Sequence, residues 1–291
     1  MVADIGIPGS VLPEIAPKTF VNGPALWRER FPWPAAGGNK YSRGHAVILG
    51  GDKMTGASRL AAEGARRIGA GLVTIVASPE TAAIYASGRP GTIVATAGDD
   101  AAFESLIADE RMNALLLGPG AGVSQWTRTR VLAALKTGRS CVLDADALTV
   151  FRDDPRTLFD AIRGPCLLTP HEGEFARLFR AAGDKISRAR QAARESGATL
   201  LLKGADTVIG SVDGRSVINA DAPPELATAG SGDVLAGMAV GLMAQGMDPF
   251  DAACAAAWLH GQAATAFGPG LIAEDLVEEL PTSLGKLKRN F

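Results

Sequence analysis

The chain has 291 residues, of which 47% are hydrophobic and 21% are charged, and its formal net charge is -2 at pH 7. This near-neutral balance gives no global field for nucleic acid or for an anionic membrane surface. The three cysteines lie in apolar runs without zinc-site spacing, and no apolar segment is long enough to cross a bilayer, so we expect a cytoplasmic protein with buried thiols.

The first part of the chain lacks a sustained period. From Met1 to about Trp33 it carries Pro8, Pro13, Pro17, Pro24 and Pro32. Prolines at this density punctuate helices and strands. We therefore expect a linker or a wrapped arm here, and one continuous core in the rest of the chain.

A β-α-β unit follows from Lys40 onward. His45 to Leu49 is a short apolar strand, Gly56 to Gly69 has helical periodicity, and Leu72 to Val76 returns as a strand. Parallel strands joined in this way cross over with a right hand. This unit predicts the beginning of a parallel sheet.

Further apolar runs of strand length continue the alternation: Thr92 to Ala95, Ala114 to Leu117, Cys141 to Leu143, Cys166 to Thr169 and Thr199 to Lys203. Runs without polar alternation predict strands covered on both faces. We therefore predict an α/β fold, a doubly wound, mainly parallel sheet with helices on each side. Asp206 to Ser211 and Ser216 to Asn219 predict a hairpin at one edge of this sheet. The chain then finishes with helices at Val234 to Gln245, Pro249 to Phe267 (capped by Asp248) and Ala273 to about Leu280.

Polar and glycine-rich segments follow the predicted strands. They are Asp52 to Ala57, Gly118 to Gly122 (GPGAG), Asp144 to Asp146 (DAD), Thr169 to Glu174 (TPHEGE) and Lys203 to Thr207 (KGADT). Ligands of doubly wound folds bind beyond the carboxyl ends of the strands, so these segments predict a site there. Neither a complete P-loop nor a complete GxGxxG sequence occurs, which argues against the common nucleotide-binding fingerprints.

The TPHEGE segment reads in part as a helix cap. Thr169, Pro170 and Glu172 suit the N-cap, the first helical position and a capping partner. That interpretation leaves His171 free to hold a ligand and Glu174 free to orient the water of a metal ion. The other histidines, His45 and His260, read as structural.

Three charged residues at strand ends have two interpretations each. Lys203 suits a phosphate or ribose contact, although a surface lysine is the default. Asp144 and Asp146 suit Mg²⁺ or a ribose hydroxyl, although such a turn is often only a loop.

The segment from Asn219 to Gly237 contains the strongest catalytic candidate. Gly230, Ser231 and Gly232 form a turn that opens a helix, and free N–H groups at a helix start predict an anion hole for a phosphate. Asp233 follows at once, where the helix dipole would keep it ionised and close enough to a phosphoryl group to serve as a base. The alternative is that Asp233 only caps the first turn.

Together these segments resemble the ribokinase-like superfamily, and more narrowly the NAD(P)H-hydrate dehydratases, which repair hydrated NADH and NADPH. The matching stretches are KYSRGHAVILGG, TGAS, GAGLVTIV, LLLGPGAG, CVLDADALT, LLTPHEGEFARL, LLLKGADTVI and ELATAGSGDVLAG, in consistent order over most of residues 40–267. Such coverage is specific, whereas GSGD alone would indicate only the superfamily.

The resemblance implies ADP, or in some members ATP, as co-substrate together with Mg²⁺, and NADHX or NADPHX as substrate. It assigns the nucleotide to Lys203, Gly204, Ala205, Asp206, Thr207 and Gly232. It assigns the hydrated nicotinamide nucleotide to Ala57, Gly120, Gly122, His171 and Asp233, with Asp233 as the catalytic base.

The resemblance also implies a wider organisation. VADIGIP, near the N-terminus, is similar to the end of an epimerase domain that often precedes the dehydratase in one bifunctional chain. We therefore expect residues 1–20 to be a tail of that domain or a linker, and residues 21–291 to be the dehydratase domain. By analogy the protein is expected to be a homotetramer.

Two other functions are compatible with parts of the pattern. One is a kinase of the same superfamily that phosphorylates a vitamin precursor such as a hydroxymethylpyrimidine or hydroxyethylthiazole; TPHEGE followed by KGADT argues against it. The other is a nucleotide-binding regulatory subunit, for which an intact Asp233 would be unnecessary.

Overall fold

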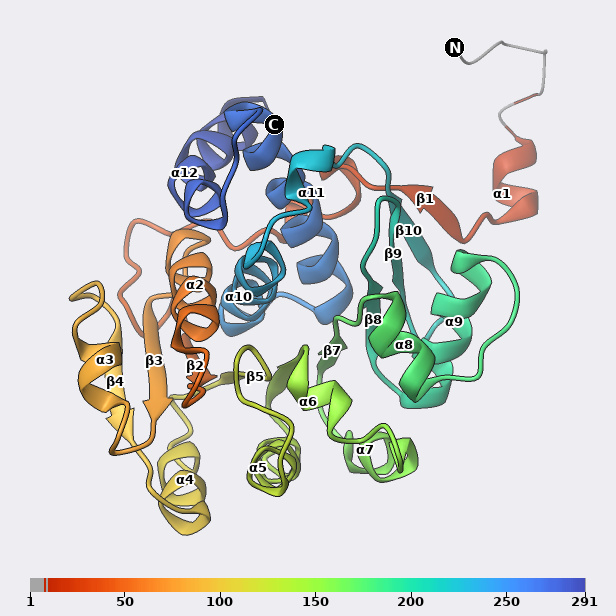
Figure 1. Cartoon of the computed structure of the whole chain (residues 1–291). Coiled ribbons are helices and arrows are strands. Elements are labelled where there is room, and N and C mark those ends of the chain that lie inside the picture. The colour runs from red at the N-terminus through yellow and green to blue at the C-terminus, as the bar shows by residue number, and fades with distance from the viewer. Residues whose placement is uncertain (1–7, 9, 291) are drawn as a thin grey trace.

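A ten-stranded sheet forms the centre of the computed structural model, which describes residues 8 and 10–290 (Figure 1). The strands follow the order β1-β10-β9-β8-β7-β6-β5-β2-β3-β4. Their bounds are β1 (Thr19–Val21), β2 (His45–Leu49), β3 (Leu72–Ala77), β4 (Ile93–Thr96), β5 (Ala114–Leu117), β6 (Ser140–Leu143), β7 (Cys166–Leu168), β8 (Thr199–Leu202), β9 (Thr207–Gly210) and β10 (Ser216–Asn219).

Helices cover both faces of this sheet (Figure 1). They are α1 (Val11–Ile15), α2 (Thr55–Arg67), α3 (Ala82–Ala86), α4 (Asp100–Ile107), α5 (Gln125–Lys136), α6 (Asp146–Thr149), α7 (Pro155–Ala161), α8 (Glu172–Leu178), α9 (Lys185–Ser196), α10 (Ser231–Ala244), α11 (Pro249–Phe267) and α12 (Ala273–Asn290), with short 3₁₀ turns η1 (Pro24–Leu26), η2 (Arg28–Arg30) and η3 (Pro224–Leu226). The α/β fold and its mainly parallel sheet are therefore confirmed. Among the described residues, no helix is long and apolar enough to span a membrane.

The apolar runs explain the two buried layers. In β2, Ala46 and Ile48 join the core formed with α2, α10, α11 and α12, whereas Val47 and Leu49 join the core formed with α4, α5, α7 and α9. Successive side chains of a strand point to opposite faces, so an unbroken apolar run is required when helices lie on both. Six adjacent strands, β7, β6, β5, β2, β3 and β4 in the order of the sheet, are parallel to one another.

The hairpin of β9 and β10 is confirmed, but its predicted place at the sheet edge is wrong. β9 pairs antiparallel with both β8 and β10, and β1 pairs parallel with the outer side of β10. The arm that carries β1 continues to Trp27, which is fully buried, and its indole N–H donates to Asn22 Oδ1 at 3.2 Å. The N-terminal segment is thus a wrapped arm from residue 19 onward, and the predicted boundary after residue 20 falls inside β1.

Two other expectations have separate outcomes. The last helix is longer than predicted, because α12 continues through Pro281 to Asn290. The VADIGIP segment, apart from Pro8, lies outside the described residues. Its relation to an epimerase domain stays a prediction.

Helices α2 and α10 pack side by side with unusually close backbones. A Cβ atom at Gly237 would overlap the carbonyl of Ala61, and one at Gly241 would meet the backbone of Ala65. Only glycine permits this approach. The two helices therefore run in the same direction, with Ala61 and Ala65 of α2 against Gly237 and Gly241 of α10.

Candidate active site

The turn at residues 230–232 opens α10 as predicted. Gly230 is the N-cap with φ of 88°, and Ser231 is the first helical residue. Ser231 Oγ donates to the carbonyl of Leu226 at 2.7 Å, and His260 Nε2 lies 2.9 Å from the Ser231 carbonyl oxygen. Burial lowers the pKa of His260 to about 4, so this side chain is neutral and structural, as expected. The helix start is therefore held by two hydrogen bonds at Ser231, and its Ser231 and Gly232 face a cavity that Leu226 and His260 also line.

Asp233 lies in the first turn of α10 and is half-buried. Burial, and then the nearby Asp144 carboxylate, raises its pKa to about 6, against the opposing effect of Lys203. We expected the helix dipole to keep this carboxyl ionised. Desolvation works against the dipole, so Asp233 is ionised at neutral pH but holds a proton more readily than an ordinary aspartate. A carboxylate of this kind is suited to accept a proton from a substrate hydroxyl.

Lys203 follows β8 and points back into the site. Its side chain is only 19% exposed, and Nζ forms an ion pair with Asp144 Oδ1 at 2.7 Å. Burial opposes its charge, but the Asp144 carboxylate more than offsets this, so the pKa of Lys203 lies above its ordinary value. A Cβ at Gly232 would lie 3.6 Å from Nζ. The ammonium group thus lies beside the start of α10, which makes the default of a surface lysine wrong.

The KGADT loop lies beside a cavity of about 840 Å³. Gly204, Ala205 and Asp206 are exposed, and Thr207 Oγ1 donates to the Gly204 carbonyl at 3.0 Å. The cavity wall includes Lys203, Gly204, Ala205, Thr207 and Gly232, five of the six predicted nucleotide residues, together with His171. Asp206 instead forms an ion pair with Lys185, whose Nζ lies 2.9 Å from Asp206 Oδ1. The structure brings this predicted set together, and its nucleotide-binding role stays a prediction.

The predicted substrate residues of the GPGAG loop pack against the start of α2. Gly120 has φ of 67°, and a Cβ there would overlap the carbonyl of Met54. Gly51 and Gly120 also meet backbone to backbone. Gly122 donates its N–H to Asp146 Oδ2 at 2.8 Å. Ala57, which is buried in the first turn of α2, donates its N–H to the same Met54 carbonyl at 3.2 Å and therefore lies close to this loop.

The cap of α8 differs from the prediction. His171, not Thr169, is the N-cap: its Nδ1 accepts N–H groups of Gly173 at 2.9 Å and Glu174 at 3.3 Å, and Glu174 Oε2 accepts the N–H of His171 at 2.9 Å. This reciprocal arrangement is a capping box. Thr169 instead donates to the Leu143 carbonyl at 3.3 Å. His171 and Glu174, which the sequence pattern left outside the cap, therefore form it. The His171 side chain is still 55% exposed, and it lines the cavity.

The carboxylates near the site are already engaged by other groups. Asp144 pairs with Lys203, Asp146 accepts from Gly122, and Glu174 completes the cap of α8. No group of three or more histidine, cysteine or acidic side chains among the described residues could hold a metal ion. The residues therefore fit an Mg²⁺ ion that comes with nucleotide phosphates better than one held by a protein cage. The metal-orienting role of Glu174 stays a prediction.

Comparison with known proteins gives a family for this arrangement. The family model of the NAD(P)H-hydrate dehydratases matches residues 46–286. The chain belongs to this family. It is 39% identical to the bifunctional NAD(P)H-hydrate repair enzyme Nnr of Salinibacter ruber, over 96% of this chain and 56% of that protein. It is 37% identical to the ADP-dependent (S)-NAD(P)H-hydrate dehydratase of Neisseria meningitidis, over 75% of each chain.

A solved structure agrees with these relatives of the dehydratase family. The ADP/ATP-dependent NAD(P)H-hydrate dehydratase of Bacillus subtilis, co-crystallized with ATP/Mg²⁺, superimposes with a TM-score of 0.78 at 28% identity, covering 88% of this chain and 94% of that chain. The predicted ribokinase-like fold is thereby confirmed. The chain spans just over half the length of the bifunctional relatives that it matches.

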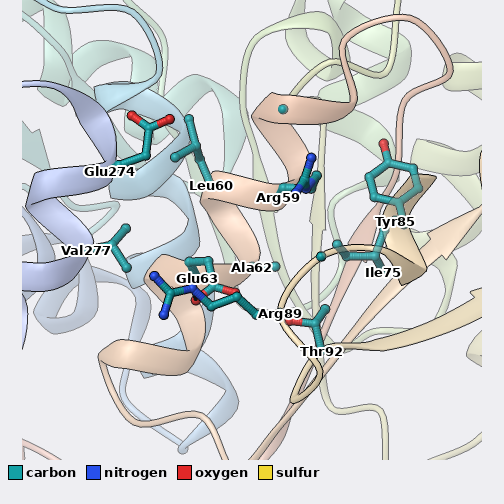
Figure 2. Close-up of a pocket in the computed structure, with 12 residues that line it drawn as sticks. Arg59, Leu60, Ala62, Glu63, Ile75, Tyr85, Arg89, Thr92, Glu274 and Val277 are labelled. Atoms are coloured by element: carbon teal, nitrogen blue, oxygen red, sulfur yellow. Dashed lines mark ion pairs between the residues drawn. The ribbon is translucent and has the colours of Figure 1, made fainter. Parts of the chain in front are cut away.

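A second cavity of this dehydratase-family chain lies apart from the predicted residues. It has a volume of about 270 Å³ and lies between α2, α12 and the segment that joins α3 to β4 (Figure 2). Glu63 and Arg89 pair across it at 3.3 Å, and the hydroxyl of Tyr85 donates to the carbonyl of Gly51 at 2.7 Å. None of the predicted site residues lines it. These contacts brace the back of α2.

The sequence patterns left the roles of Asp144 and Asp146 open, and they did not identify Thr127 as a residue of the site. The sequence allows Asp144 and Asp146 either a contact with Mg²⁺ or ribose or a place in a plain loop; the structure places them against Lys203 and Gly122, and the ligand role stays a prediction. Thr127, which is fully buried in α5, donates to the Gly122 carbonyl at 2.6 Å and was not predicted. The position of Thr127 was the available signal, since it lies in the first turn of the helix that follows the GPGAG loop, three residues after the N-cap Ser124.

Proposed function

We propose that the chain catalyses the ADP-dependent dehydration of hydrated NADH and NADPH, and so returns NADHX and NADPHX to their usable forms. The observation that carries the proposal is the position of Asp233 in the first turn of α10, with a pKa near 6 and with the Lys203 ammonium beside it. The names of the N. meningitidis and B. subtilis relatives support the nucleotide and the substrate.

The proposed reaction begins with a proton transfer to Asp233. Its carboxylate accepts the proton of the C6 hydroxyl of the hydrated ring, and the oxygen attacks the terminal phosphoryl group of ADP, which releases AMP. The N–H group of Gly232, at the start of α10, and the Lys203 ammonium stabilise the charge on the phosphoryl oxygens. Mg²⁺ bound to the phosphates would neutralise part of the same charge. Expulsion of phosphate by the ring nitrogen, with loss of a neighbouring ring proton, then gives NAD(P)H.

The two substrates have separate places in this proposal. ADP lies along the KGADT loop with its terminal phosphate toward Gly232. The hydrated nicotinamide lies on the other side of Asp233, between Ala57, Gly120, Gly122 and His171. The packing of α2 against α10 supports this division, because it brings the helix that carries Ala57 against the helix that carries Asp233.

The proposal extends to the organisation of the protein. The bifunctional S. ruber relative, of which the chain covers 56%, supports a functional link with an epimerase activity that supplies the same substrate. We also propose a cytoplasmic homotetramer that uses ADP with Mg²⁺. Size measurement and comparison of ADP with ATP test these points directly.

Turnover of hydrated NADH by the purified chain tests the function. The recovery of reduced-nicotinamide absorbance should require ADP and the protein. Asp233→Asn should reduce kcat by roughly 10²- to 10⁴-fold, because a positioned base is lost, while ADP still binds. Asp213→Asn, on the exposed turn between β9 and β10, is the matched control and should retain activity.

Two results would count against this function. Turnover of Asp233→Asn at the wild-type rate would remove Asp233 as the base. Binding of ADP without recovery of NADH, with either ADP or ATP, would favour a vitamin-precursor kinase or a regulatory nucleotide-binding subunit.

A further inference from the structure

The turn that joins β6 to α6 has an unusual backbone. Ala145 has φ of 46° and ψ of -114°, and it is one of two described non-glycine residues with positive φ. An L-residue with a Cβ is strained in this conformation and persists there only when its surroundings hold it. Such outliers cluster at functional sites, so the contacts of the two flanking residues, Asp144 and Asp146, become informative.

Asp144 faces the nucleotide half of the site. Its side chain is only 2% exposed, and Oδ1 accepts the Lys203 ammonium at 2.7 Å. A buried carboxylate needs a partner of this kind, and the partner in turn is held in one place. The position of the Lys203 charge beside Gly232 therefore depends on Asp144.

Asp146 faces the other half. Its Oδ2 accepts the N–H of Gly122 at 2.8 Å, while Thr127 donates to the carbonyl of the same glycine at 2.6 Å. Gly122 is thus held at both its N–H and its carbonyl group. This fixes the end of the GPGAG loop, whose middle residue, Gly120, packs against the start of α2.

Asp144 and Asp146 are separated only by Ala145, yet their side chains contact opposite halves of the site. An ordinary extended or helical conformation at Ala145 would turn the following chain, and Asp146 with it, in a different direction. We propose that the turn at residues 144–146 is a positioning device that fixes the phosphate-binding lysine and the substrate loop relative to one another. The proposal rests on the dehydratase function proposed above and assigns Asp144 and Asp146 as positioning residues instead of metal or ribose ligands.

A crossed pattern of substrate affinities tests this assignment. Asp144→Asn should weaken ADP binding about tenfold, because Lys203 loses its charged partner, and should leave the KM for NADHX within about twofold. Asp146→Ala should do the reverse: it should raise the KM for NADHX at least about fivefold and leave ADP binding within about twofold. Asp146→Asn should restore most of this loss, since its side-chain oxygen can still accept the N–H of Gly122.

The backbone conformation is tested by two variants at the same position. Ala145→Gly should keep both constants, because glycine adopts positive φ readily, whereas Ala145→Val should impair ADP binding and the KM for NADHX together. Asp153→Asn, whose side chain is fully in solvent a few residues later, is the matched control. Thermal unfolding of each variant identifies those that simply fail to fold.

Different results would contradict the positioning role of residues 144–146 and the proposed dehydratase function. Binding of ADP, and of NADPH as a product probe, is measured by calorimetry without any turnover. A wild-type chain that binds both nucleotides but does not dehydrate NADHX would contradict the proposed function. Equal losses of both affinities in folded Asp144→Asn and Asp146→Ala proteins, or no rescue by Asp146→Asn, would overturn the positioning device.

Discussion

The two halves of the site are held in different ways. On the substrate side, the GPGAG loop packs backbone to backbone against Gly51 and Met54, and the buried Thr127 hydroxyl fixes its end. On the nucleotide side, Gly204, Ala205 and Asp206 are exposed, and the ion pair of Lys185 with Asp206 holds their loop. Where two backbones touch, an added side-chain atom forces one of them to move, whereas an ion pair with an exposed partner is screened by solvent and contributes little. We therefore expect the substrate side to tolerate substitution far less than the nucleotide side.

The reacting groups lie where the two halves meet. Asp233 interacts electrostatically with Asp144, Lys203 and Asp146, which come from both sides of the site. The charges of both halves therefore influence the pKa of the Asp233 carboxylate. The contrast in how the halves are held can therefore be tested separately at the loop glycine, at the base and at the surface ion pair.

Among the changes that test how the two halves are held, the largest effect is expected from Gly120→Ala. The new methyl group would overlap the Met54 carbonyl, and alanine would be strained at φ of 67°, so the loop must move. Because misplacing a binding loop by about 1 Å can cost on the order of 10²-fold, kcat/KM for NADHX should fall at least that far. Steady-state kinetics with NADHX at saturating ADP measures this loss.

Gly56→Ala is the control for this substitution. Gly56 lies in α2 close to the same loop, but a Cβ there would meet nothing within 4 Å. The variant should keep its activity and gain roughly 0.5 kcal/mol of stability from the better helix former. Full activity of a folded Gly120→Ala protein would contradict the close packing of the substrate side.

The pH dependence of kcat/KM, which reports the ionisations of the free enzyme, should show the next largest effect. Since burial and Asp144 raise the pKa of Asp233 to about 6, the base is ionised above this pH and protonated below it. Activity is therefore lost as pH falls, by about tenfold per pH unit below the pKa, and is level above it. Initial rates between pH 5 and pH 8, with unfolding followed by circular dichroism as the control, would contradict the assignment if no acidic limb is found near pH 6.

Periodicity predicted the frame of this site but not the contacts across it. The buried strands and the opening of α10 follow from apolar runs and from the glycines before Asp233, which are local signals. The pairing of Asp144 with Lys203 joins residues 59 positions apart, and no local pattern encodes such a contact. The three-residue β1 was missed because it is too short to show a period.

The cap of α8 shows a second limit of local reasoning. Thr169 and Pro170 satisfy the usual preferences for a helix start, so the sequence favoured a start there. The helix begins two residues later because His171 Nδ1 accepts the free N–H groups and Glu174 completes the box. An unusual cap residue thus overrode the common one, and it did so at a site where the same histidine also faces the cavity.

The smallest effect is expected at the surface ion pair of the nucleotide side. Lys185→Ala removes the partner of Asp206. The Asp206 side chain is 66% exposed although that of Lys185 is only 13% exposed, and a pair with its carboxylate in solvent is worth about 0.2 to 1 kcal/mol. The Kd for ADP should therefore rise by no more than about fivefold, and the difference from wild type should shrink in high salt because exposed charges are screened. Calorimetry at low and high salt measures both, with Lys136→Ala, on the exposed end of α5, as the matched control. A loss as large as that of Gly120→Ala would mean that the nucleotide loop is held as rigidly as the substrate loop.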